Sequence, residues 1–111
     1  MQNQKKGFAD NMSNNNKNID FKNLINERKK VLIDFYASWC GPCQKLIPIL
    51  NIFAQENPDI EIIKIDVDLH REYIKEYNIK SFPTLILFQN GEETKRKIGY
   101  CSKEELKSFV E

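Results

Sequence analysis

The stretch VLIDFYASWCGPC, residues 31–43, joins an apolar run to a pair of cysteines. Five of the six residues 31–36 are apolar, which is typical of a central strand buried on both faces. From residue 43 to residue 55, apolar residues recur at helical spacing. The sequence therefore predicts that both cysteines lie where a buried strand gives way to a helix.

Cys40 and Cys43 stand three residues apart, so on a helix their Cβ atoms lie about 5–6 Å apart. A slight adjustment brings them within the Cβ separation of a disulfide, about 3.5–4.5 Å. Unpaired amides at a helix N-terminus favour a thiolate, and Pro42 suits the first turn because its missing N–H is not needed there. Gly41 adds no side chain that would shield the first sulfur. We expect Cys40 to be the nucleophile and the more shielded Cys43 to be the resolving thiol.

Composition narrows the class of protein. The 111 residues suit one domain, and a net charge of +1 gives no field for nucleic acid or an anionic membrane. No apolar run approaches the roughly 18 residues that cross a bilayer. A C-x-x-C motif without a secretion signal points to a reducing compartment, here expected to be the cytoplasm. Residues 1–18 are polar and predicted to form a flexible tail before a domain at 19–111.

The remaining elements are predicted from periodicity, caps and turn signals. The sequence indicates helices at 20–28, 69–77 and after Ser102, with strands at 60–67, 85–88 and 93–98. Asp20 and Asp68 are predicted to cap their helices, Pro48 to kink the helix after the cysteines, Asn90-Gly91 to turn a hairpin, and Ser102 with Glu105 to form a capping box. We expect an α/β fold with three parallel strands, an antiparallel hairpin edge and helices on both faces. The dithiol would then lie at the C-terminal end of a central strand.

Taken together, these motifs resemble the thioredoxin family over residues 19–111. The matching residues are the stretch 34–43, Pro48, KIDVD at 64–68, FPTL at 82–85, Phe88, Asn90-Gly91 and Ile98-Gly99. The resemblance implies a thioredoxin fold and a protein disulfide reductase. It also implies disulfide-containing target proteins, no bound cofactor or metal, and recycling by a thioredoxin reductase, usually an NADPH-dependent flavoprotein. We further expect a monomer.

The sequence departs from the family pattern in several places. The family's strand before the first helix has no clear counterpart, and Tyr36 replaces a common Trp. Gln44 stands where Lys or Arg is usual, and Phe82 stands where Ile or Val is typical. The missing strand and Phe82 leave the substrate preference open, and none of the departures changes the expected chemistry.

Asp34 is the single acid in the central strand, and burying a carboxylate there is costly unless it is partnered or neutral. Burial should raise its pKa, which suits a proton acceptor for a buried thiol. The resemblance implies that Asp34 is the general base acting on Cys43, and that Lys64 lies near this acid. The alternatives are a structural carboxylate and a lysine that only extends to solvent.

Pro83 would be assigned a trans bond from sequence alone, because only about 5–6% of X-Pro bonds in folded proteins are cis. The resemblance implies a cis bond instead. It also implies that this loop lines a groove where the backbone of Phe82 pairs with an extended substrate segment. The residues predicted to bind substrate are Trp39, Gly41, Pro42, Phe82, Pro83 and Gly99.

Other interpretations remain open beside the reductase. A zinc site would need four ligands, and Cys101 and His70 lack the spacing to complete one. Cys101 is interpreted as a small apolar residue, with a regulatory disulfide as the alternative, and His70 as a solvated helix residue. A thiol oxidase or disulfide isomerase and a redox-independent binding subunit are alternative functions for the same groove.

Overall fold

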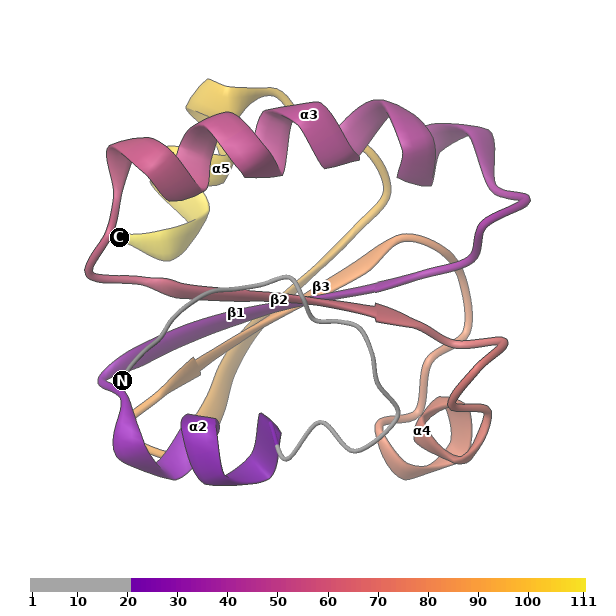
Figure 1. The fold of residues 1–111 in the computed structure, drawn as a ribbon, viewed down its shortest axis with the longest axis horizontal. Helices are drawn as coiled ribbons and strands as arrows, with labels where there is room; N and C mark the ends of the chain where they lie inside the picture. Colours follow the sequence, from indigo (N-terminus) through magenta and orange to yellow (C-terminus); the bar gives the residue numbers. More distant parts are fainter. Residues whose placement is uncertain (1–20) are drawn as a thin grey trace.

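The computed structural model describes residues 21–111 (Figure 1). The predicted tail, the Asp20 cap and the position of the family's first strand lie outside these residues. The elements, in order, are α2 (Phe21–Glu27), β1 (Lys30–Tyr36), α3 (Gly41–Glu56), β2 (Glu61–Asp66), α4 (Glu72–Glu76), β3 (Thr84–Gln89), β4 (Glu92–Ile98) and α5 (Lys103–Val110).

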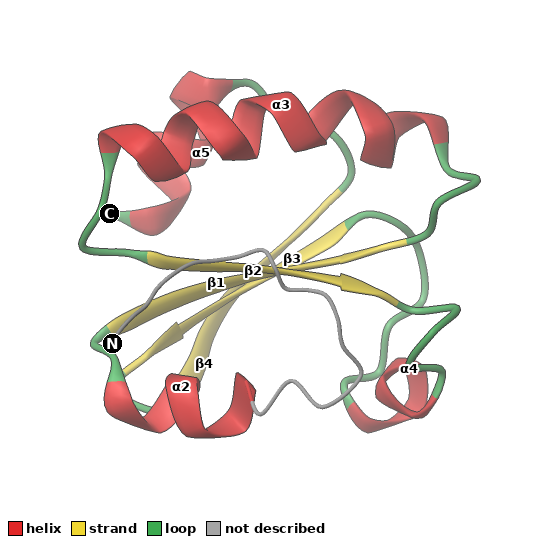
Figure 2. Cartoon of the chain, in the orientation of Figure 1, coloured by secondary structure: helices red, strands yellow, loops and turns green. Residues whose placement is uncertain are grey.

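The strands form one mixed sheet in the order β2-β1-β3-β4, with helices on both faces. Helices α3 and α5 cover one face, while α2 and α4 lie against the other (Figure 2). Strand β1 is therefore central, and its C-terminal end leads directly into the loop that carries the first cysteine. The predicted α/β fold with a mixed sheet is confirmed.

The direction of β3 corrects the sequence prediction. We expected three parallel strands, but only β1 and β2 are parallel, and β3 runs antiparallel to β1. The reason is helix length: α3 has 16 residues and, at 1.5 Å per residue, spans about 24 Å, enough to return the chain to the start of the sheet. Helix α4 has 5 residues and cannot do so, so β3 begins at the end of the sheet where β2 finished.

Strand β1 contributes to two cores because successive side chains point to opposite faces. Val31, Ile33 and Phe35 belong to one buried cluster, and Leu32 belongs to a second cluster with residues of α3 and α5. Asp34 alternates with Phe35, so it lies on the same face as Leu32 and is fully buried. The prediction of a strand buried on both faces is confirmed.

Several local signals produce the expected structure. Asn90 and Gly91 have φ of 53° and 89°, as a tight hairpin turn requires, and Ser102 and Glu105 form the capping box of α5. Helix α3 continues through Pro48, and the kink expected there stays a prediction. Two lysines bind the C-terminal end of α5: Lys30 Nζ donates to the Val110 carbonyl at 2.6 Å and Lys95 Nζ to that of Phe109 at 3.0 Å.

The helix predicted at 69–77 is wrong in its start and its cap. Helix α4 begins only at Glu72, and it has no side-chain cap. Asp68 instead accepts a hydrogen bond from Trp39, so its carboxylate serves the cysteine loop rather than a helix N-terminus. None of the helices within residues 21–111 has the length and apolar character to span a bilayer.

Candidate active site

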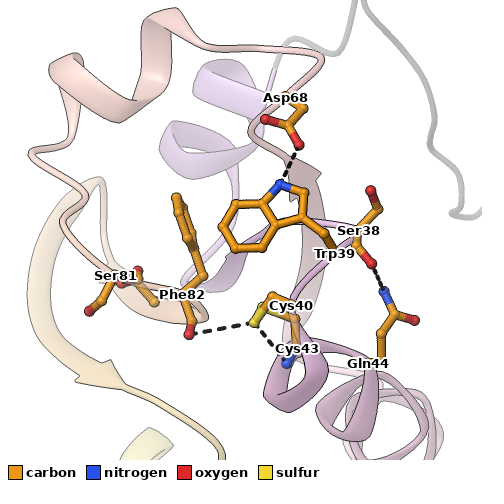
Figure 3. Close-up of a disulfide and its surroundings, with 9 residues drawn as sticks. Ser38, Trp39, Cys40, Cys43, Gln44, Asp68, Ser81 and Phe82 are labelled. Atoms are coloured by element: carbon orange, nitrogen blue, oxygen red, sulfur yellow. Dashed lines mark hydrogen bonds between the residues drawn. A yellow bond between two sulfur atoms is a disulfide. The ribbon is translucent and has the colours of Figure 1, made fainter.

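The two cysteines lie at the start of α3 and form a disulfide, with their Cα atoms 5.3 Å apart. Cys40 is the N-cap residue, Pro42 lies in the first turn and Cys43 follows it. The Cys43 N–H donates a hydrogen bond to Cys40 Sγ at 3.2 Å (Figure 3). An unpaired helix amide therefore points at the first sulfur, where it favours a thiolate when the pair is reduced.

The two sulfurs differ in access. Cys40 keeps 8% of its surface exposed, whereas Cys43 is fully buried. A Cβ built on Gly41 would meet no atom within 4 Å, so the surface beside Cys40 is open. An incoming disulfide can therefore approach Cys40 but cannot reach Cys43 first.

The loop before β3 lies against the first sulfur. The Phe82–Pro83 peptide bond is cis, which confirms what the family resemblance implies. The Phe82 carbonyl oxygen lies 3.6 Å from Cys40 Sγ, within reach of a reduced thiol as donor (Figure 3). The N–H of Gly99, which has a φ of 93°, donates to the Pro83 carbonyl at 2.8 Å. Segments around residues 40, 82 and 99 thus meet at one end of the sheet.

Trp39 covers this junction while remaining 69% exposed. Its Nε1 donates to Asp68 Oδ2 at 2.9 Å, and its ring meets the Phe82 ring edge-on with centroids 5.7 Å apart (Figure 3). Asp68 is in turn paired with Arg71 at 3.2 Å. The indole is therefore fixed in orientation although most of its surface faces solvent.

Gln44 is one of the positions that depart from the family pattern. Its Nε2 donates to the Ser38 carbonyl at 3.1 Å, which ties α3 back to the loop that carries Trp39. The neutral amide of Gln44 thus stands where the family usually has a cation, and it binds the loop before the dithiol.

Asp34 lies on the face of the sheet that α3 covers, two residues before the C-terminal end of β1. It is fully buried, and neither carboxylate oxygen has a hydrogen-bond partner within the described residues. Burial raises the pKa of Asp34 to about 7, and the nearby charge of Lys64 opposes that rise. Lys64 is the direct neighbour of Asp34 in the pairing of β1 with β2. Lys64 thus lies near Asp34, as the resemblance implies, and the role of Asp34 as the general base stays a prediction.

Comparisons with known proteins agree with this geometry. The family model described as Thioredoxin matches residues 11–111. A thioredoxin of Mycoplasmoides gallisepticum is 46% identical over 87 residues, which cover 78% of this chain and 87% of the relative. A thioredoxin of Rickettsia typhi is 40% identical over 101 residues, covering 89% and 96%. The X-ray structure of Fasciola hepatica thioredoxin superposes with a TM-score of 0.76 at 33% identity, covering 82% and 88%.

The chain belongs to the thioredoxin family. With its paired cysteines at the head of α3, it is a thiol–disulfide oxidoreductase. The cysteine motif and Pro83 lie at the end of the sheet where β1 finishes, and Asp34 lies on β1 close to this end.

The structure adds surface residues that the sequence analysis missed. Leu69, Ile98 and Tyr100 are 75%, 63% and 50% exposed, and Ile98 and Tyr100 flank Gly99 beside Pro83. Leu69 would have been the first residue of the helix predicted at 69–77, which begins only at Glu72. Ile98 and Tyr100 could have been found from the sequence, because they are two apolar residues on either side of Gly99 after a largely charged strand.

Cys101 and His70 lie in different surroundings and do not form a site together. Cys101 is fully buried among the apolar residues under α3 and α5, and burial raises the pKa of its thiol. His70 stacks on Tyr73 and lies 3.9 Å from a Glu72 oxygen. Within residues 21–111, no three His, Cys, Asp or Glu side chains gather in a way that would hold a metal ion.

Proposed function

We propose that this thioredoxin-family chain is a protein disulfide reductase that exchanges its dithiol with disulfides in target proteins. One observation carries the proposal: Cys40 Sγ lies at a helix N-terminus, accepts the Cys43 N–H, and borders the Phe82–Pro83 loop at an exposed junction. This arrangement favours an ionised, accessible sulfur next to a surface where an extended segment can bind.

In the first step the Cys40 thiolate attacks one sulfur of the target disulfide. The target's S–S bond breaks, its other sulfur leaves as a thiolate, and a mixed disulfide joins Cys40 to the target. Trp39, Phe82, Pro83 and Gly99 hold the target segment, with Gly41 and Pro42 forming the open surface beside the sulfur.

In the second step Cys43 resolves the mixed disulfide. Asp34 takes the Cys43 proton, directly or through water, and the Cys43 thiolate attacks Cys40 Sγ. The Cys40–Cys43 disulfide forms, the bond to the target breaks, and the second target sulfur leaves as a thiolate. Two electrons have then moved from the dithiol to the target. The Asp34 carboxylate must be ionised to act, which its pKa of about 7 permits at neutral pH.

The oxidised chain must receive two electrons to act again. We infer that a thioredoxin reductase, an NADPH-dependent flavoprotein, supplies them and that the chain itself holds no cofactor. We further propose that it works as a monomer in the cytoplasm, a compartment in which thiols are kept reduced.

The test is insulin-disulfide reduction with dithiothreitol or with NADPH and a bacterial thioredoxin reductase. We expect Cys40→Ser to abolish activity, and Cys43→Ser to accumulate mixed disulfides with target proteins. Full activity of either variant would refute the assignment. A reduction potential as oxidising as that of known thiol oxidases, about −120 mV, would favour the oxidase alternative instead.

A further inference from the structure

Lys64 and Asp34 face the same side of the sheet. They are direct neighbours in the β1–β2 pairing, and Leu32 and Ile62, two residues earlier in each strand, both pack into the cluster under α3 and α5. Asp34 is buried without a hydrogen-bond partner among the described residues, and burial is the main cause that raises its pKa. The Lys64 charge opposes that rise, so moving this charge would change how readily Asp34 ionises.

The position of that charge is not fixed by the sheet alone. Among the described strands β2 is the outermost, and a lysine carries its ammonium on a flexible four-carbon stem that can turn to solvent. In the structure Lys64 Nζ donates a hydrogen bond to Asn51 Oδ1 on α3. Asn51 follows Cys43 by about two helical turns, so one helix carries both the resolving thiol and the group that binds the ammonium.

We propose that Asn51 is a positioning residue for the resolving step, which holds the Lys64 ammonium over the face of the sheet where Asp34 is buried. The inference rests on the proposed function, in which Asp34 receives the Cys43 proton. A neutral amide suits this task because it binds the ammonium and leaves its charge undiminished. A carboxylate at the same place would offset that charge, and an apolar side chain would not bind the ammonium.

The other ionisable groups on this face do not replace Lys64 as the charge that acts on Asp34. Tyr36 on β1 and Cys101 before α5 both feel the Asp34 charge, and burial is the main cause that raises the pKa of each, so both stay neutral near pH 7. Asp66 lies two residues after Lys64 on the same face and is the acid that would compete for its ammonium. The backbone N–H of Asp68 already donates to Asp66 Oδ1.

The remaining described elements on this side contribute a cation on β4, Lys97, and an acid on α5, Glu105, and both act on Cys101. The β3 neighbour of Asp34 is the apolar Leu85, and Lys97 of β4 pairs with Leu85 in turn. Lys97 lowers the pKa of Cys101, whereas Lys64 is the cation that acts on Asp34. The group that sets the Lys64 position can therefore affect the resolving step through the ionisation of Asp34.

The experiment follows the resolving step directly. Reduced full-length protein is mixed with 5,5′-dithiobis(2-nitrobenzoate) in a stopped-flow instrument: attack by Cys40 releases one thionitrobenzoate, and attack by Cys43 on the mixed disulfide releases the second. The rate of the second release is recorded from about pH 5 to pH 9, where the protonation of Asp34 determines it.

We expect Asn51→Leu and Asn51→Ala to move the midpoint of this profile upward by about half a pH unit and to slow the second release about twofold to threefold at neutral pH. Asn51→Asp should move it further, and Asn51→Gln, which keeps the amide, should restore most of the wild-type profile. In a Lys64→Met background, Asn51→Leu should have no additional effect, because the group that Asn51 holds is gone.

Gln55→Leu is the matched control: it makes a polar-to-apolar change on an exposed position of α3, one turn from Asn51, and should leave the profile unchanged. An unshifted profile in Asn51→Leu, or an equal shift in the Lys64→Met background, would overturn the inference. If the wild-type protein releases only one thionitrobenzoate, the proposed function fails instead, so the two failures are distinguishable.

Discussion

At the dithiol end of the sheet one buried carboxyl and one exposed ring occupy costly positions, whereas at the opposite end two lysines pair with helix carbonyls. Asp34 is buried with no hydrogen-bond partner among the described residues, and Trp39 is largely exposed. At the other end, Lys30 and Lys95 bind the last carbonyls of α5, where cations favour the negative end of the helix dipole. The difference indicates that one end is arranged for reaction and the other for stability.

The largest test of this comparison is Asp34→Asn. With a folded-state pKa of about 7 against an ordinary 3.8, the folded protein holds this proton more tightly than the unfolded chain, so stability falls as pH rises from about 4 to above 7. At about pH 8, ionising the buried carboxyl costs up to about 4 kcal/mol. We expect Asp34→Asn to raise the free energy of unfolding by several kcal/mol there and to change it little near pH 4.

Denaturant unfolding of the oxidised protein at both pH values measures this effect. The same variant should reduce insulin more slowly at neutral pH, because the proton acceptor for Cys43 is gone. If Asp34→Asn kept the wild-type dependence of stability on pH, another group would be responsible and the comparison would fail at its main point.

The opposite end should respond in the reverse direction. We expect Lys30→Met and Lys95→Met each to lower the free energy of unfolding by about 1 kcal/mol, with the partly buried Lys30 having the greater effect. Insulin reduction should stay at the wild-type rate. Lys29→Met, at the exposed position next to Lys30, is the control and should be near neutral. Loss of activity in the Lys30 or Lys95 variant would contradict the assignment of this end to stability alone.

A smaller test compares two glycines with nearly the same backbone. Gly91 at the hairpin and Gly99 near Pro83 have φ of 89° and 93°, so alanine should cost about 1 kcal/mol at either position. At Gly91 an added Cβ would also lie 3.1 Å from Asn26 Oδ1. We expect only Gly99→Ala to slow insulin reduction as well, measured as a loss in rate at equal folded fraction. Equal activity of the two variants would argue against a groove at Gly99.

Much of this arrangement is predictable from local patterns. The apolar run 31–36, the cysteine spacing, the Asn90-Gly91 turn and the Ser102–Glu105 box each depend on residues close in sequence, and each forms as expected. The cis bond before Pro83 is different, because the residues alone favoured trans and the family resemblance was needed to reverse that.

The parts that could not be predicted depend on distance across the fold. The direction of β3 is decided by how far α4 extends, and the predicted helix was too long by its first turn. Asp68 reads as a helix cap until Trp39, 29 residues earlier, is placed beside it. Asn51 is an ordinary surface position until the packing of α3 against β2 brings Lys64 within its reach.

Both sulfurs lie within the first turn of a single helix. Joining or parting them requires no strand to shift and no domain to rotate, so the oxidised and reduced forms should share nearly the same outline. A target or a reductase must then tell the two forms apart from a handful of atoms around Cys40, rather than from a change of shape. The rate of turnover would then depend on disulfide exchange at Cys40 and not on the movement of a lid.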